Sequence, residues 1–142
     1  MGKELVRNGY KVRFLLMQEL VDILCGCDDF DMDKSSASEK RKAELLDVDY
    51  LILDECFDKS KVTVYKSGYQ LPYLDTFLRK RLESYHKPIV FISNVEPSRI
   101  EDSGYGASIH ALVNRNTVGA LLEFKDNFYE ASNESAFADI FA

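Results

Sequence analysis

Two adjacent carboxylates, Asp54 and Glu55, directly follow an apolar run at residues 50–53. A short, continuous apolar run is typical of a strand that is covered on both faces of a parallel sheet. In open α/β sheets, ligands bind beyond the carboxyl ends of the strands. Carboxylates at that position suit a hard cation such as Mg²⁺, because one can hold the metal while the other orients and deprotonates a water. The alternative is a solvated acidic turn.

A neutral amide, Asn94, follows a second apolar run at residues 88–92, with Ser93 between them. An amide can donate a hydrogen bond to a phosphate oxygen and accept one from a water at the same time. Asn94 therefore suits a phosphate-binding site beyond a strand end. The alternative is an Asx turn, which is common after strands.

One arginine, Arg115, follows a predicted short helix at residues 108–114. A guanidinium group can clamp a phosphoryl group during its transfer, and it can do so from a neighbouring subunit. The alternative is a surface arginine that interacts with the C-terminal end of its helix. Arg99 could compete for the same role.

Other charged or metal-binding residue types carry weaker signals. Two basic runs, at residues 40–42 and 79–81, could contact DNA phosphates, but such runs are more often solvated helix faces. Structural zinc sites usually have two close pairs of ligands, whereas this chain has one close pair with unusual spacing. The residues that would have to form such a site are Cys25, Cys27, Cys56, His86 and His110.

The composition limits the class of protein. The 142 residues include 18 Lys and Arg against 24 Asp and Glu, for a net charge of −6, which disfavours wrapping of nucleic acid by bulk charge. The apolar share of 46% argues against wholesale disorder, and the length corresponds to about one domain. No apolar run approaches the roughly 20 residues that span a bilayer. With no signal peptide at the N-terminus and three cysteines, we expect a cytoplasmic protein with reduced thiols.

The hydrophobic periodicity predicts strands that alternate with helices. Strands are expected over residues 10–15, 50–53, 88–92 and 118–124. Helices are expected over residues 3–8, 17–24, 36–46, 71–85 and 108–114. Gly9 would end the first helix, and Ser36 with Glu39 would form a capping box that opens the third. This alternation predicts a layered α/β fold with a mostly parallel sheet flanked by helices.

The remaining segments lie between and after these elements. Residues 26–34 are acidic and are expected to form a loop. Residues 56–70 have no clear period and are expected to form a long loop, with a hairpin around residues 62–65. We expect residues 1–125 to form the core and residues 126–142 an acidic C-terminal tail, with a short amphipathic helix around residues 136–141.

Three motifs, in this order and spacing, resemble those of AAA+ P-loop ATPases. Residues 51–55 (Leu-Ile-Leu-Asp-Glu) match a Walker B box, residues 92–94 (Ile-Ser-Asn) match the end of a sensor 1 strand, and residues 109–115 resemble the arginine-bearing helix. The resemblance covers most of residues 4–124. Within these ATPases, the chain most resembles the DnaC-like helicase loaders and their phage relatives, which in turn resemble transposition helper ATPases.

The resemblance implies a role for each candidate residue. Asp54 would coordinate Mg²⁺ and Glu55 would polarise the attacking water. Asn94 would act as sensor 1 and contact the ATP phosphates, and Arg115 would be an arginine finger for nucleotide held by the next subunit. The implied partners are a replicative helicase or other subunits of an AAA+ oligomer, and single-stranded DNA is a further ligand that the resemblance allows, whereas no membrane is implied.

The sequence departs from this family at its start. The family has a strand and a glycine-rich Walker A loop ending in Gly-Lys-Ser/Thr, which holds the phosphates through backbone N–H groups. The 142 residues contain no such loop. The chain is therefore expected to be a partial AAA+ core without its first strand and phosphate loop: a fragment, a truncated product or a degenerate relative. We expect it to bind ATP weakly or not at all by itself.

Three functions remain open on the sequence alone. The first is a segment of an ATP-dependent DNA replication ATPase of the helicase-loader type. The second is a non-catalytic protein-interaction module derived from an ATPase fold. The third is an unrelated metal-dependent hydrolase in which Asp75, Glu96 or His110 would supply further ligands to the Asp54–Glu55 pair.

Overall fold

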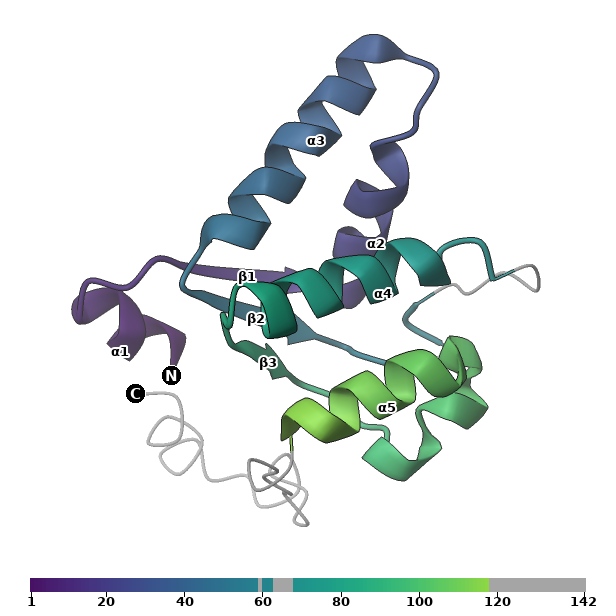
Figure 1. Ribbon diagram of the computed structural model, residues 1–142. Helices are drawn as coiled ribbons and strands as arrows, with labels where there is room; N and C mark the ends of the chain where they lie inside the picture. The colour runs from purple at the N-terminus through teal and green to yellow at the C-terminus, as the bar shows by residue number, and fades with distance from the viewer. Residues whose placement is uncertain (59, 63–67, 118–142) are drawn as a thin grey trace.

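The computed structural model describes residues 1–58, 60–62 and 68–117. In this part of the chain, three parallel strands form a sheet in the order β1-β2-β3. The strands are β1 (Val12–Leu16), β2 (Tyr50–Asp54) and β3 (Ile89–Phe91). Figure 1 shows the sheet with helices packed along it, so the predicted layered α/β fold with a parallel sheet is confirmed.

Five α-helices accompany the strands, and shorter helical turns extend or precede two of them. The α-helices are α1 (Gly2–Arg7), α2 (Met17–Gly26), α3 (Met32–Asp47), α4 (Leu71–Arg79) and α5 (Gly106–Thr117). A π-helical turn, η1 (Lys80–Ser84), continues α4, and the turns η2 (Pro97–Arg99) and η3 (Glu101–Tyr105) precede α5. None of the described helices is long and apolar enough to cross a membrane.

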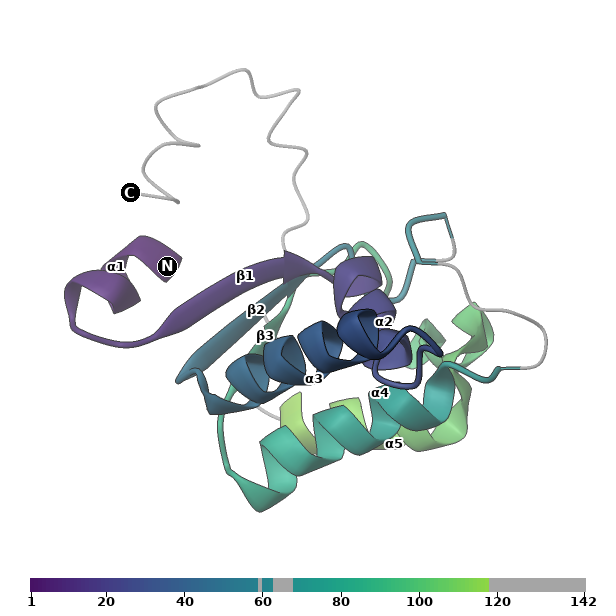
Figure 2. The ribbon, with the colours of Figure 1, turned by 90° about the horizontal axis from the view of Figure 1, so that it is seen from above.

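The helices α2, α3, α4 and α5 lie on one side of the sheet (Figure 2). The strands present alternate residues to this side, and Leu15, Leu51 and Leu53 are almost fully buried there. The helix residues that share this core include Met17, Leu20, Leu74, Phe77, Leu78, Ile109 and Leu112. Burial of large aliphatic and aromatic side chains contributes about 1.5–3 kcal/mol each, which makes this one layer the main source of stability.

The strand register brings the carboxyl ends of the strands to one edge. Leu16 of β1 pairs with Asp54 of β2, and Leu53 of β2 pairs with Phe91 of β3. The α2–α3 pair and α4 with η1 therefore connect this carboxyl edge back to the amino edge, where β2 and β3 begin. No loop separates β1 from α2, because α2 begins directly after Leu16, as the spacing predicts.

The start of α3 differs from the prediction. The sequence favours a capping box at Ser36, but the helix begins four residues earlier with Asp31 as its N-cap. The Asp31 Oδ1 atom accepts hydrogen bonds from the backbone N–H groups of Asp33 at 3.0 Å and Lys34 at 3.4 Å. An aspartate is as good an N-cap as serine, and it satisfies N–H groups that would otherwise lack partners. The acidic loop is therefore shorter than residues 26–34.

The basic run at residues 79–81 is only partly a solvated face. Arg79 is exposed, but the side chain of Arg81 is completely buried. Its guanidinium group donates to the backbone carbonyl oxygens of Leu45, Leu46, Val48, Asp49 and Pro88. Burial lowers the pKa of Arg81 to about 10, with Asp49 opposing the shift, so the group stays cationic at neutral pH. Arg81 is thus unavailable to DNA.

Of the other predicted elements, one agrees with the structure and several fall outside the described residues. The helix at residues 3–8 ends as predicted, with Gly9 in the left-handed region at a φ of +87°. The strand at residues 118–124, the helix around 136–141 and the boundary between the core and the acidic tail lie outside the described residues. So does most of the hairpin around residues 62–65.

Candidate functional site at the carboxyl edge of the sheet

The segments after β2 and β3 are held together at the carboxyl edge by three hydrogen bonds. The Ile92 N–H donates to the Leu53 carbonyl at 2.8 Å, and the Cys56 N–H donates to the Ile92 carbonyl at 3.0 Å. The Ser93 hydroxyl then donates to the Cys56 carbonyl at 2.6 Å. The structure therefore places the Asp54–Glu55 turn and the Ser93–Asn94 turn beside each other, as the sequence predicts for two parallel strands.

The backbone of the turn after β2 is unusual. Glu55 and Phe57 both adopt left-handed conformations, with φ values of 53° and 65°. Such conformations cost a non-glycine residue about 1–2 kcal/mol and persist only where the surroundings impose them. The conformation of Phe57 is imposed by packing, since its ring is buried against the rings of Phe91 and Tyr105, whose centroids lie 5.7 and 5.1 Å away.

Cys56, between these two residues, has a structural rather than a chemical role. It is fully buried, and its thiol donates to the Leu53 carbonyl at 3.2 Å. Burial raises the pKa of the Cys56 thiol to about 12. The thiolate is the form that binds metal or attacks a substrate, so Cys56 is inert at neutral pH.

The two carboxylates differ in their partners. Asp54 is half-buried, and its Oδ1 atom accepts a hydrogen bond from the Glu55 N–H at 2.7 Å. Glu55 has a side chain that is 39% exposed and forms an ion pair with Lys61, whose Nζ lies 3.8 Å from Oε1. Neither the ion pair nor the bend that produces it is apparent from the sequence, because Lys61 lies in a stretch without periodicity.

The carboxylates at this turn fit a Mg²⁺ ion that takes most of its ligands from water and substrate rather than from the protein. Mg²⁺ commonly takes one or two carboxylates and completes its octahedron with waters and substrate phosphates. The half-buried Asp54, with one oxygen oriented by the Glu55 N–H, could supply the carboxylate. In the part of the chain that the structure describes, no group of three or more His, Cys, Asp or Glu side chains could form an all-protein metal site.

Asn94 is exposed beside this turn. The hydrogen bonds of this loop are made by the side chain of the adjacent Ser93 instead. The Ser93 Oγ atom accepts a hydrogen bond from the Val95 N–H at 2.9 Å while donating to the Cys56 carbonyl. Among the described residues, the Asn94 side chain forms no hydrogen bond, so the expected alternative of an Asx turn does not account for it. The amide is therefore free to contact a ligand at this edge.

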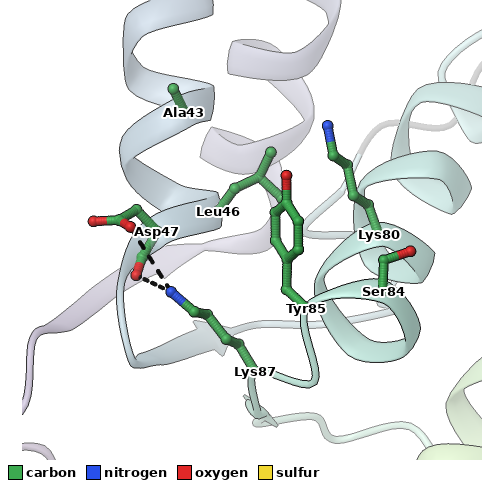
Figure 3. A pocket seen from close by; sticks show the side chains of 7 residues that line it. All are labelled: Ala43, Leu46, Asp47, Lys80, Ser84, Tyr85 and Lys87. Atoms are coloured by element: carbon green, nitrogen blue, oxygen red, sulfur yellow. Dashed lines mark hydrogen bonds and ion pairs between the residues drawn. The ribbon is translucent and has the colours of Figure 1, made fainter.

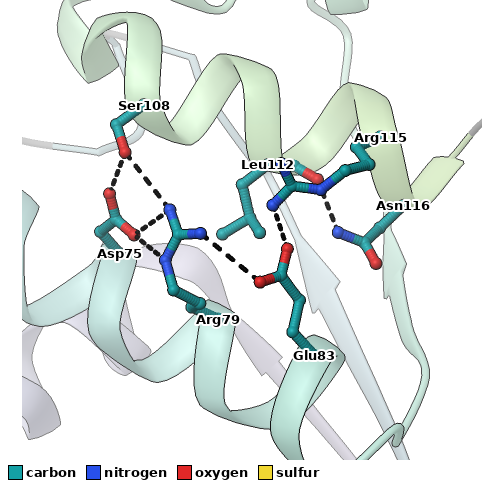
Figure 4. Close-up of polar contacts among 7 residues, drawn as sticks. All are labelled: Asp75, Arg79, Glu83, Ser108, Leu112, Arg115 and Asn116. Atoms are coloured by element: carbon teal, nitrogen blue, oxygen red, sulfur yellow. Dashed lines mark hydrogen bonds and ion pairs between the residues drawn. The ribbon is translucent and has the colours of Figure 1, made fainter.

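Arg115 lies at the opposite edge of its own molecule, because α5 runs from the carboxyl edge toward the amino edge. It is in the last turn of α5 and forms an ion pair with Glu83 on η1 (Figure 4). Arg99, its predicted competitor, follows β3 on η2 and is exposed. Within one chain, the structure brings Asp54, Glu55 and Asn94 to one edge and leaves Arg115 outside that group.

The residues suggested for other metal sites have other partners. Asp75 accepts hydrogen bonds from Arg79 at 3.1 Å and from Ser108, both on the outer surface (Figure 4). His110 lies 3.5 Å from Glu101 and 2.8 Å from the Asn114 amide. In the part of the chain that the structure describes, neither residue therefore joins Asp54 and Glu55 in a group of three metal-binding side chains.

The described residues form a layered α/β fold with a parallel three-stranded sheet, and solved structures of replication proteins share this fold. Over 99% of its length, the chain is similar to AMPPCP-bound DnaA from Aquifex aeolicus, with a TM-score of 0.64 and 18% identity. Over 81%, it is similar to the crystal structure of a DNA replication initiation factor, with a TM-score of 0.60 and 15% identity.

These similarities concern the fold and only part of each neighbour. The chain spans 39% of the DnaA chain and 32% of the initiation factor chain. No protein-family model matches the sequence. A search of curated proteins also finds no match.

Proposed function

We propose that this chain is a segment of an ATP-dependent DNA replication ATPase of the AAA+ class, of the helicase-loader type. The observation that carries the proposal is the connection between the two strand ends, in which the Ser93 hydroxyl donates to the Cys56 carbonyl. It joins the acidic turn to the turn with the exposed amide, and α/β folds bind ligands beyond the carboxyl ends of their strands, which supports the proposal. The similarity in fold to two replication proteins supports the same class.

In this proposal, each residue at the edge has a separate task. Asp54 would hold Mg²⁺, which neutralises phosphate charge when bound. Glu55 would orient and deprotonate the attacking water, once its carboxylate leaves Lys61. Asn94 would donate to a phosphate oxygen. Arg115 would act on nucleotide held by a neighbouring subunit, which agrees with its distance from Asp54 in its own chain.

The proposed partners are a replicative helicase or other subunits of an AAA+ oligomer, with single-stranded DNA as a further ligand. The 142 residues include no Gly-Lys-Ser/Thr loop, so this chain alone should bind nucleotide only weakly. A proposed cytoplasmic location follows from the same role in replication.

Because the expected affinity is low, the test must detect weak binding. Amide signals of the ¹⁵N-labelled chain would be followed by NMR during titration with ATP and Mg²⁺ to about 10 mM, a range that detects millimolar dissociation constants. We expect shifts that cluster at residues 54–56 and 92–95 and that disappear in Asp54→Asn. Glu96→Gln, just outside the site, is the matched control. Shifts that are centred elsewhere, or that Asp54→Asn leaves unchanged, would refute the proposal.

A second function, a non-catalytic interaction module, is favoured by the Lys61–Glu55 ion pair. A cation that pairs with the proposed general base at 3.8 Å gives the carboxylate a structural partner. An interaction module should tolerate Asp54→Asn and Glu55→Gln together, with partner binding unchanged. An ATPase segment should lose the Mg²⁺-dependent shifts in the same double variant.

A further inference from the structure

The two faces of the sheet are covered unequally by the described elements. The helices α2, α3, α4 and α5 pack against one face (Figure 2). On the other, outer face, α1 lies close to β2, since a Cβ atom added to Gly2 would be 3.4 Å from Ile52 Cδ1. Parallel sheets occur almost only where both faces are covered. Because α1 has only 6 residues, we expect a further segment to cover part of the outer face.

The outer face carries exposed aromatic side chains along β1. Val12 and Phe14 point away from the core residue Leu15, because side chains alternate along a strand. Phe14 is 60% exposed and Tyr10, just before β1, is 46% exposed. The Tyr10 ring packs edge-on against Tyr50 of β2, with centroids 5.2 Å apart. We call Tyr10, Val12, Phe14 and Tyr50 the outer patch; exposed apolar patches commonly mark surfaces that bind another segment or molecule.

The segment that carries most of the outer patch is basic, although the protein is acidic. Residues 1–16 contain four basic residues and one acidic residue, for a net charge of +3, whereas the whole chain carries −6. The basic residues are Lys3, Arg7, Lys11 and Arg13. An apolar patch bordered by positive charge favours a partner that is both apolar and acidic.

Two of these four cations have no acidic partner among the described residues. Lys11 Nζ lies 3.7 Å from Asp47, which also pairs with Lys87 at 3.8 Å (Figure 3). Arg7 lies 3.9 Å from the acidic residue of its own helix. Lys3 and Arg13 are exposed and form no ion pair within the part of the chain that the structure describes. Their charge is available to an acidic segment.

The acidic tail expected at residues 126–142 has the complementary chemistry. It contains four acidic residues and neither lysine nor arginine. Its residues Phe137, Ile140 and Phe141 recur at the i, i+3, i+4 spacing that places side chains on one face of a helix. The tail therefore combines an apolar face with negative charge, as the outer patch requires.

The tail is close enough in the chain to reach the outer patch. Arg115, in the last turn of α5, pairs with Glu83 on η1, just before β3 begins. The end of α5 therefore lies at the amino edge, where β1 also begins. Residues 118–125 can span about 26 Å at about 3.3 Å per residue. Three strands about 4.8 Å apart are only about 10 Å wide, so this link can cross the sheet.

We propose that residues 126–142 dock on the outer patch of their own chain, with the apolar face of the tail against Tyr10 and Phe14. The carboxylates of the tail then lie near Lys3 and Arg13. Docking covers the second face of the sheet and keeps other acidic molecules off it. The contact uses none of the residues of the proposed nucleotide site, so it stands or falls independently of the proposed function.

The test uses the absence of tryptophan from the 142 residues. Phe14→Trp places a single fluorophore on the outer patch, and a docked tail should shield it from quenching by acrylamide. Adding Phe137→Ser and Phe141→Ser should raise the quenching constant severalfold. Phe30→Trp, at a fully exposed position between α2 and α3, is the matched control and should be quenched rapidly with or without the tail changes. Tyr10→Trp, also on the patch, should behave like Phe14→Trp.

Charge and concentration identify what covers the patch. In the Phe14→Trp chain, Lys3→Glu with Arg13→Glu should release the tail, whereas Lys34→Glu with Lys40→Glu, an equal change of charge on α3, should not. Shielding should weaken as salt rises from about 0.1 M to about 1 M, because the screening length falls from about 10 to 3 Å. It should not depend on protein concentration.

Three results would overturn the proposal. The first is rapid quenching of both patch tryptophans in the chain with an unaltered tail. The second is shielding that grows with protein concentration, which would indicate a second copy on the patch. The third is shielding that the tail substitutions leave intact, which would indicate another segment of the chain.

Discussion

The hydroxyl of Ser93 donates a hydrogen bond to the backbone carbonyl of Cys56 at 2.6 Å, although 37 residues separate them in the chain. The same hydroxyl oxygen accepts from the Val95 N–H. One side chain thus connects the turn that carries Asp54 and Glu55 to the turn that carries Asn94. Together with the two backbone hydrogen bonds between the same segments, this contact sets the relative position of the acidic and amide groups.

Substitution of Ser93 tests that connection. Ser93→Ala removes both hydrogen bonds and should lower the free energy of unfolding by about 1 kcal/mol, because the Cys56 carbonyl loses its partner. Amide NMR signals of Glu55 and Cys56 should shift as well. Ser98→Ala, on the exposed turn η2, is the control and should change neither quantity. Equal stability of the two variants would contradict the role of Ser93.

The left-handed conformation of Glu55 predicts an inverted preference between glycine and alanine. Glu55→Gly should be more stable than Glu55→Ala by about 1 kcal/mol, since only glycine adopts a φ of 53° without strain. At the exposed Glu44, in the interior of α3, the order should reverse because glycine is more flexible in the unfolded state. Urea unfolding of the four variants measures both differences. The same order at the two sites would argue against strain at Glu55.

Burial of Arg81 predicts a large loss of stability on its removal. Arg81→Met should lower the free energy of unfolding by about 3 kcal/mol or more, because five backbone carbonyls lose a charged donor. Arg81→Lys should recover only part of the loss, since an ammonium group cannot reach all five. Lys80→Met, at the adjacent exposed position, should cost within about 0.5 kcal/mol. Chemical denaturation of the three variants checks this order.

Two buried acidic groups predict a loss of stability at alkaline pH. Burial raises the pKa of Cys56 from 9.0 to about 12 and also raises the pKa of Tyr105. Above about pH 9 the unfolded chain therefore releases protons that the folded chain retains, and the free energy of unfolding falls as the pH rises toward 12. Urea unfolding at several pH values should show this slope.

Two single substitutions should each weaken this dependence of the free energy of unfolding on alkaline pH. Cys56→Ala removes the thiol, and Tyr105→Phe removes a buried hydroxyl that has no hydrogen-bond partner among the described residues. Tyr105→Phe should therefore not lower stability at neutral pH, because no hydrogen bond is lost. Slopes identical to that of the wild type in both variants would show that other groups cause the alkaline effect.

The ion pair between Arg115 and Glu83 should contribute little to stability. Its side chains are 58% and 33% exposed, and exposed pairs typically contribute about 0.2–1 kcal/mol. Arg115→Ala should therefore leave unfolding nearly unchanged, and a double-mutant cycle with Glu83→Ala should give a coupling in that range. A weak contact leaves Arg115 available to a neighbouring subunit, as the proposed function requires. A coupling above about 2 kcal/mol would instead indicate a structural role.

Much of the fold is predictable from local sequence because its signals are local. The apolar run at residues 50–53 predicts β2 (Tyr50–Asp54), and the alternation of strands with helices predicts parallel pairing. Parallel strands bring their carboxyl ends to one edge, so the proximity of Asp54 and Asn94 follows from the pattern alone. The roles of these residues toward a nucleotide remain proposals.

Other features depend on contacts between segments far apart in the chain. Arg81 looks like part of a solvated basic run, and only the packing of η1 against the end of α3 shows that it is buried. Ser36 has the capping pattern in sequence, but α3 begins with Asp31 as its N-cap, whose side chain accepts from the Asp33 and Lys34 N–H groups.

The order of the elements and the edge at which the polar residues gather follow from the sequence, because periodicity and strand direction are properties of consecutive residues. Which polar groups are free to act depends on the folded structure. A side chain's partners, as with Ser93 and Cys56 or Glu55 and Lys61, are set by distances across the fold that no local pattern encodes.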